Sequence, residues 1–158
     1  MRFADSITRI YLYNCCFNRP FDDKENINIK LESIAKLYIQ NLIKEGNLEL
    51  AWSYLLESEN DENPFPDKRI SIAGWKDISC INIEENEELL VKAEEYIKFG
   101  IKSKDAIHIA CALLTKCNYF LTTDKGILKK SKSISGIEIL GPIEFVNKLE
   151  DLRNQIWN

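Results

Sequence analysis

The feature that most constrains the fold of this chain is the alternation of short apolar segments with longer segments of helical periodicity. Segments typical of β-strands cover residues 8–13, 48–53, 80–83, 119–122 and 137–140. Helical spacing of apolar residues fills the regions between them, and the longest such segment covers residues 25–45. Strands that alternate with helices are typical of a parallel sheet covered by helices. We therefore predict an α/β fold with a parallel sheet of about four to five strands flanked by helices.

Residues with strong positional preferences predict where several helices begin and end. Gly46 follows the longest helical segment, at a position suited to a left-handed C-terminal cap. Asn86 and Ser103 each precede a helical segment and are expected to serve as N-caps. Pro142 suits the first position of the terminal helix, because proline lacks the N–H group that a first helical residue leaves unpaired.

The length and composition indicate one globular domain. The 158 residues match a common domain size, and we expect a single domain over residues 1–158. Hydrophobic residues make up 45% of the chain, which is too many for a disordered protein. The five cysteines form no Cys-x-x-Cys pair, so neither a disulfide framework nor a structural zinc site is favoured.

The charge and hydropathy exclude two kinds of partner. A net charge of −4 argues against broad, sequence-independent binding to nucleic acid, which requires many cations facing the phosphates. No apolar run approaches the roughly 18 residues that a membrane-spanning helix needs, so we expect no membrane partner. Together with the cysteine pattern, this predicts a cytoplasmic protein with reduced thiols.

Three carboxylates stand where ligands bind in a parallel sheet, beyond the carboxyl ends of the strands. Asp124 directly follows the segment 119–122, and Asp105 lies in the first turn of the helix before it. Glu59 follows the segment 48–53 and is expected on a short helix. Carboxylates that converge repel one another, and a bound Mg²⁺ or Mn²⁺ would offset that repulsion.

Each carboxylate also has a purely structural interpretation. The helix dipole alone favours an acid at Asp105, and Asp124 could be a helix cap or turn residue. Glu59 stands in an acidic run, so it could simply be exposed to solvent. From the residues alone, both interpretations stay open.

Two motifs around these acids resemble the PIN domain. They are Lys-Asp-Ala-Ile-His-Ile-Ala-Cys-Ala at 104–112 and Tyr-Phe-Leu-Thr-Thr-Asp at 119–124. Residues 10–20 are similar to the opening strand and loop of that family, and Glu59-Asn60 is similar to its second acidic position. Residues 141–146 are similar to the ending of a subgroup, so the resemblance covers nearly the whole chain.

The resemblance implies a three-layer α/β/α fold and a metal-dependent nuclease, often an RNA-cleaving toxin of a bacterial toxin–antitoxin pair. Glu59, Asp105 and Asp124 would then occupy the second, third and fourth acidic positions and hold Mg²⁺ or Mn²⁺. The implied partners are RNA as substrate, an antitoxin protein and a second copy of the chain in a homodimer.

The chain departs from the family at the first acidic position, where Tyr13 replaces an aspartate. A phenol stays neutral at pH 7, so the site loses a negative charge and a hard oxygen ligand. An impaired or inactive nuclease is the favoured interpretation. The alternative is a working nuclease in which Asn14, Asp22 or Asp23 supplies the missing oxygen.

Further side chains near these motifs are candidates for supporting roles. Asn14, Arg19 and Lys125 are candidate substrate contacts, with a solvated surface role as the alternative. His108 lies three residues after Asp105 on the same helical face. It could be a general base or metal ligand, but a packed histidine bonded to the backbone or to a neighbouring acid is favoured.

Three hypotheses about function follow from the sequence. The first is a Mg²⁺- or Mn²⁺-dependent endoribonuclease, and the second is a catalytically inactive module that binds RNA or a protein. The third is a purely structural α/β module, in which the three carboxylates never meet.

Overall fold

The centre of the molecule is a five-stranded parallel sheet with helices on both faces. The computed structural model describes residues 7–17 and 27–157 of the chain. The strands are β1 (Arg9–Leu12), β2 (Glu49–Ser53), β3 (Ile81–Ile83), β4 (Tyr119–Leu121) and β5 (Glu138–Leu140). They lie in the order β3-β2-β1-β4-β5, and every pairing is parallel. The predicted α/β fold with a parallel sheet is confirmed.

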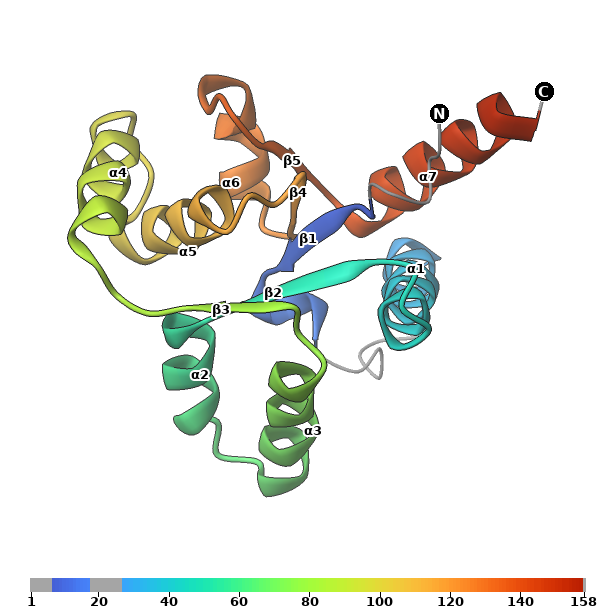
Figure 1. Cartoon of the computed structure of the whole chain (residues 1–158), viewed down its shortest axis with the longest axis horizontal. Helices are drawn as coiled ribbons and strands as arrows, with labels where there is room; N and C mark the ends of the chain where they lie inside the picture. Colours follow the sequence, from blue (N-terminus) through green and yellow to red (C-terminus); the bar gives the residue numbers. More distant parts are fainter. Residues whose placement is uncertain (1–6, 18–26, 158) are drawn as a thin grey trace.

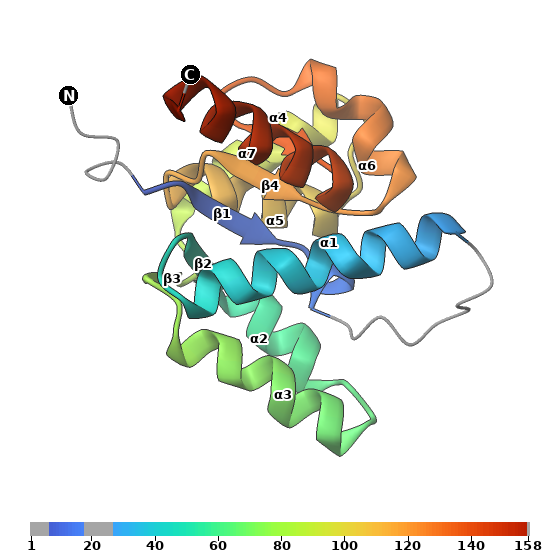
Figure 2. The ribbon, with the colours of Figure 1, turned by 90° about the vertical axis from the view of Figure 1, so that its right-hand side faces the viewer.

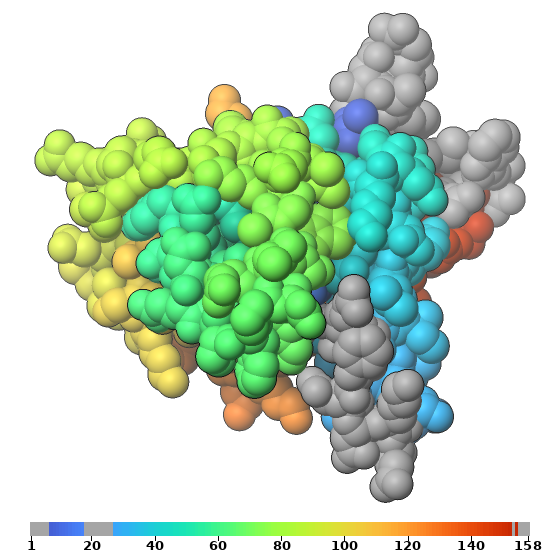
Figure 3. All heavy atoms as spheres, turned by 90° about the horizontal axis from the view of Figure 1, so that it is seen from below, coloured from blue at the N-terminus to red at the C-terminus, as the bar shows by residue number. Residues whose placement is uncertain are grey.

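The helices form the outer layers of the molecule. They are α1 (Ile27–Lys44), α2 (Tyr54–Asp61), α3 (Pro66–Asp77), α4 (Glu87–Lys98), α5 (Ser103–Leu114), α6 (Lys125–Lys130) and α7 (Pro142–Trp157). Helices α1 and α7 pack side by side on one face of the sheet (Figures 1 and 2). Helix α5 lies on the opposite face and α4 packs against it. Helices α2 and α3 form the surface beside α1 in Figure 3.

The core explains why β1 occupies the middle of the sheet. Ile10, Tyr11 and Leu12 are at most 1% exposed, as expected for a strand covered on both faces. Helix α5 faces the sheet with His108, whose ring reaches the Tyr11 hydroxyl of β1. Small residues of α5 such as Ala106 and Ala110 are fully buried.

Most of the predicted helix ends are confirmed. Gly46 has a positive φ of 80°, and the side chain of Asn86 accepts a hydrogen bond from the Leu89 N–H group. Pro142 is the first residue of α7. The prediction of Ser103 as an N-cap is wrong.

Helix α5 begins one residue earlier than predicted. Ser103 is its first residue, and the N-cap is Lys102, which makes no capping hydrogen bond with its side chain. Ile101 is only 4% exposed, so its burial anchors the chain just before this turn, and Lys102 keeps the extended backbone of a cap. The Ala106 N–H group donates to the Lys102 carbonyl at 2.8 Å and closes the first turn. Asp105 remains in that first turn, as predicted.

Two further expectations concern the thiols and the helices. All five cysteines carry free thiols, in agreement with the absence of a disulfide framework. Within residues 7–17 and 27–157, no helix is long and apolar enough to cross a membrane.

Candidate functional site

The candidate site lies where β1, β2 and β4 end, at one edge of the parallel sheet. Tyr13 directly follows β1, and its N–H group donates to the Leu121 carbonyl of β4 at 3.0 Å. Ser53 ends β2, and its hydroxyl accepts a hydrogen bond from the Leu56 N–H group in the first turn of α2. The short helix expected around Glu59 is therefore present and begins directly at the end of β2.

Tyr13 bonds directly to one of the predicted site carboxylates. Its hydroxyl donates to Asp105 Oδ1 over 2.6 Å. The Tyr13 ring also packs 4.7 Å from the ring of His108, measured between centroids. Burial, followed by the hydrogen bond to Asp105, raises the pKa of Tyr13 far above its usual value. The phenol is therefore a neutral donor that satisfies an oxygen of Asp105.

Glu59 is held by three side chains from two other elements. Its Oε1 accepts hydrogen bonds from Asn14 Nδ2 and from His108 Nε2, the latter at 2.7 Å. Its Oε2 lies 3.3 Å from Lys104 Nζ. Burial acts to raise the pKa of Glu59, but the bonds from His108, Asn14 and Lys104 outweigh it and lower the pKa below the usual value. Glu59 is thus a carboxylate whose charge the protein itself compensates.

His108 connects Glu59 to the core through a buried chain of hydrogen bonds. Its side chain is fully buried, and Nδ1 lies 2.6 Å from the Tyr11 hydroxyl, which lies 2.8 Å from Ser53 Oγ. Because the Glu59 carboxylate only accepts, we assign the His108 proton to Nε2. In a neutral ring, Nδ1 then accepts from Tyr11, and Ser53 donates to the Tyr11 oxygen. The favoured interpretation, a packed histidine bonded to a neighbouring acid, agrees with this arrangement.

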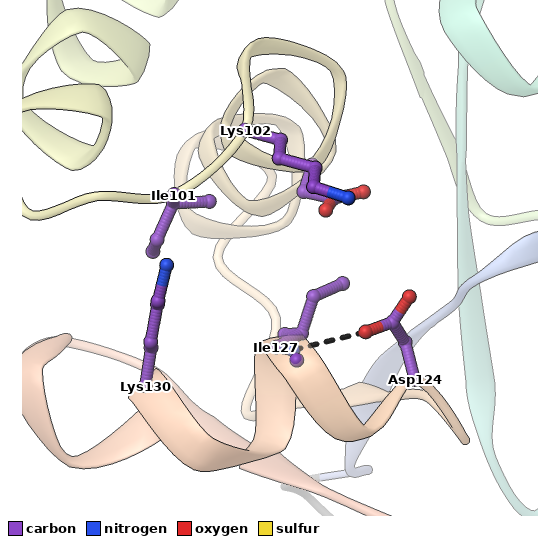
Figure 4. A pocket seen from close by; sticks show the side chains of 7 residues that line it. Ile101, Lys102, Asp124, Ile127 and Lys130 are labelled. Carbon is purple, nitrogen blue, oxygen red and sulfur yellow. Dashed lines mark hydrogen bonds between the residues drawn. The ribbon is translucent and has the colours of Figure 1, made fainter.

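Asp105 and Asp124 line one small pocket of about 70 Å³ between the starts of α5 and α6 (Figure 4). Lys102 and Lys130 line the same pocket, and the Lys130 ammonium donates to the Gly100 carbonyl. Asp124 is the N-cap of α6, and its Oδ1 accepts from the Ile127 N–H group at 3.0 Å. The cap interpretation of Asp124 is therefore correct, whether or not the residue also serves a site.

The donor set as arranged does not fit a bound divalent cation. A hard cation such as Mg²⁺ needs several free oxygen ligands at about 2.0–2.1 Å. One oxygen of Asp105 accepts the Tyr13 proton, and Glu59 is bonded to His108, Asn14 and Lys104. Among the described residues, no group of three or more His, Cys, Asp or Glu side chains is arranged to hold a metal ion.

The structure brings together some of the predicted residues but not all of them. Asn14 contacts Glu59 rather than open solvent, and Lys125 is the exposed first residue of α6. Arg19, Asp22 and Asp23 lie outside the described residues.

Three lysines at the site were missed by the sequence analysis, namely Lys102, Lys104 and Lys130. A signal was available for Lys104, which stands four residues before His108, so that both reach Glu59 from one face of α5. For Lys102 and Lys130, no sequence pattern indicates that two separate helices meet at one pocket.

Comparisons with known proteins show which solved structures have a similar fold. A scan of protein-family models found no match, and a search of curated proteins found none either. A crystal structure of VapBC2 from Rickettsia felis bound to a DNA fragment from their promoter is similar, with a TM-score of 0.54 and 13% identity. The match covers 85% of this chain and 98% of that one.

A second similar structure is DNA-bound VapBC from Salmonella typhimurium, with a TM-score of 0.50, 11% identity and the same two coverages. The VapC toxin of such complexes is a PIN domain. At this low identity the likeness concerns the fold. In its parallel sheet and flanking helices, the chain therefore has the fold of the PIN domain.

Proposed function

We propose that this chain is a PIN-fold protein of the toxin–antitoxin type whose endoribonuclease site is impaired by Tyr13. The observation that carries the proposal is the 2.6 Å hydrogen bond from the Tyr13 hydroxyl to Asp105 Oδ1. An aspartate at position 13 would add a negative charge beside Asp105 and call for a cation. Tyrosine instead adds a neutral proton donor, so one oxygen of Asp105 is satisfied by the protein itself and no charge is added.

The environment of Glu59 supports the same proposal. Glu59 keeps a lowered pKa through its bonds to His108, Asn14 and Lys104, without any bound ion. A metal would have to compete with an ammonium group and a buried imidazole for the same two oxygens. Glu59, Asp105 and Asp124 are therefore proposed as the remnants of a Mg²⁺ or Mn²⁺ site with RNA as its substrate.

An antitoxin is the proposed protein partner. Both similar structures are VapBC complexes bound to DNA, and each match spans 98% of the other chain. A toxin-type fold with an impaired site could still bind an antitoxin, since that contact does not require catalysis. A homodimer of this chain is proposed on the family resemblance alone.

The decisive experiment compares the natural chain with Tyr13→Asp in two measurements, Mn²⁺ affinity by calorimetry and cleavage of a mixed RNA substrate. We expect the variant to bind Mn²⁺ at least tenfold more tightly and to cleave RNA faster. The double variant Tyr13→Asp/Asp105→Ala serves as the control and is expected to lose both gains. Equal Mn²⁺-dependent cleavage by the natural chain and by Tyr13→Asp would overturn the proposal.

A second candidate function is a catalytically inactive module that binds RNA or a protein partner. The closed chain of hydrogen bonds from Glu59 through His108 and Tyr11 to Ser53 favours it, because those groups need no substrate or ion to be satisfied. Inactivity of both the natural chain and Tyr13→Asp, with RNA or antitoxin binding retained, would select this candidate.

A further inference from the structure

Two neighbouring thiols lie beside the carboxylates and take no part in the functions proposed above. Cys15 and Cys16 belong to the 3₁₀ turn Asn14–Cys16, which follows β1. Their sulfur atoms are 4.0 Å apart. Cys15 is half-buried, and Cys16 is 2% exposed. The turn thus holds a half-buried thiol next to a buried one.

The end of β4 fixes the position of both sulfur atoms. The Thr123 N–H group donates to Cys15 Sγ at 3.4 Å, and Thr122 Oγ1 lies 3.9 Å from the same sulfur. Cys16 Sγ donates to the Leu121 carbonyl at 3.5 Å. The pair is therefore held by the residues that lead into Asp124 as well as by its own turn.

The two thiols differ in how readily they ionise. The contact with Cys16, and then hydrogen bonds from Thr123 and Thr122, lower the pKa of Cys15 to about 5 against the opposing effect of burial. The same pairing raises the pKa of Cys16. Cys15 is thus the nucleophile of the pair, because the thiolate is the form that binds metals and attacks electrophiles.

We propose that Cys15 and Cys16 form a two-thiol site for a soft, thiophilic metal or metalloid ion. Two metal–sulfur bonds of about 2.3 Å can span at most about 4.6 Å between sulfur atoms, so a separation of 4.0 Å allows both to meet one ion. Soft ions prefer thiolate ligands to the oxygen ligands of the neighbouring carboxylates. This inference does not depend on nuclease activity.

The number of available ligands restricts which ions this site could bind. Among the described residues, no third His, Cys, Asp or Glu joins these two thiols in a metal-binding group. A four-ligand structural zinc site is therefore not expected here. The site suits ions that two thiols satisfy, and trivalent arsenic is the representative used in the test.

The probe is phenylarsine oxide, added to the folded full-length chain. Two S–H bonds break and two S–As bonds form, while the oxygen leaves as water with both protons and arsenic stays trivalent. Intact-mass spectrometry is expected to show one arsenic bridge per chain, kept after a wash with a monothiol and removed by a dithiol.

The folded geometry is tested by thermal unfolding, because adjacent cysteines in an unfolded chain can also bind arsenic. A ligand that prefers the folded state raises the unfolding midpoint, and one that prefers the unfolded state lowers it. We expect a rise of a few degrees with the probe. An unchanged or lowered midpoint would show that the folded protein does not offer this site.

Single-cysteine variants complete the test. Cys15→Ser keeps the size of a half-buried side chain, and its fold can be checked by circular dichroism. We expect it to lose the bridge and the rise in midpoint, whereas Cys80→Ser, which removes an exposed cysteine remote in sequence, should keep both. The proposal would be overturned if Cys15→Ser kept the arsenic bridge and the rise in midpoint. It would also be overturned if Cys80→Ser lost them, because the probe would then bind at Cys80.

Discussion

The proposed function depends most on one residue, Tyr13. It stands at the end of the central strand, where its hydroxyl reaches Asp105 and its ring packs against His108. A carboxylate at this position would bring like charges together, whereas the phenol converts the contact into a charge-assisted hydrogen bond. This hydrogen bond is the contact on which the proposed impairment rests, because an aspartate here would add negative charge that a cation would have to balance.

The contribution of the hydrogen bond between Tyr13 and Asp105 to stability can be measured by removing only the Tyr13 hydroxyl. Tyr13→Phe keeps the ring but leaves Asp105 Oδ1 without its donor, and a hydrogen bond to a charged group contributes about 1.5–3 kcal/mol. Since Asp105 is only partly buried, water replaces some of that loss. We expect the free energy of unfolding to fall by about 1–2 kcal/mol, as measured by urea denaturation at pH 7.

Tyr54→Phe is the matched control for that prediction. The Tyr54 hydroxyl also donates to a carboxylate, Glu85 Oε1, but at 3.3 Å and in an exposed setting. Its removal is expected to change stability by no more than about 0.5 kcal/mol. Equal losses in the two variants would mean that the Tyr13 bond is no stronger than a surface contact.

At the scale of single elements, Asp124 has two roles that can be separated. It caps α6 through its bond with the Ile127 N–H group, and its carboxylate lines the pocket shared with Asp105. Capping needs only a side-chain oxygen, whereas a cation site needs the negative charge. Asparagine keeps the first property and loses the second, and alanine loses both.

We therefore expect Asp124→Ala to lower the free energy of unfolding by about 1 kcal/mol, and Asp124→Asn to lower it by only a few tenths. Asn86→Ala gives a comparison, because Asn86 caps α4 in the same way, through the Leu89 N–H group. The measurement is denaturant unfolding of all three variants. If Asp124→Asn were as destabilised as Asp124→Ala, the negative charge rather than the cap would be the stabilising feature.

The elements also show what the sequence could and could not predict. Local rules predicted the cap at Asn86, the left-handed Gly46 and the proline that begins α7, because each depends on backbone geometry within a few residues. The same rules failed at Ser103, because the burial of Ile101 decides where α5 starts. Burial is a property of the whole fold, so a local pattern does not reveal it.

The same distinction applies to the candidate site. Acids at strand ends and in the first turn of a helix were predictable from the order of the elements. The spacing of Lys104 and His108 indicated one shared helical face, but not that Glu59 would meet it together with Asn14, because these residues come from distant parts of the chain. Only the packing of α5 against the ends of β1 and β2 brings them to one carboxylate.

At the scale of the whole molecule, the core depends on β1 being covered on both faces, and α5 supplies one cover. Cys111 lies in α5 and Cys117 lies just before β4, and their side chains are 0% and 6% exposed. Burial raises the pKa of each thiol to about 12, because a buried thiolate lacks the water that would stabilise its charge. The free energy of unfolding is therefore expected to fall at alkaline pH.

The direction of this linkage follows from the two pKa values of each thiol. In the unfolded chain a cysteine ionises near pH 8.5, but in the folded chain these two stay protonated to about pH 12. Their contribution is complete below about pH 8.5 and is lost as the pH rises toward 12. We expect the free energy of unfolding to fall by about 2–4 kcal/mol between pH 8 and pH 10, measured with urea under reducing conditions.

The double variant Cys111→Ala/Cys117→Ala isolates the cause of that fall. It removes the two buried thiols, so its stability should change much less over the same pH range, even if it is lower at pH 8. Cys15 and Cys16 remain in both proteins, and their pKa values shift in opposite directions, so their contributions oppose each other. An identical alkaline loss in the double variant would attribute the effect to other groups with raised pKa values, such as Tyr11 and Cys16.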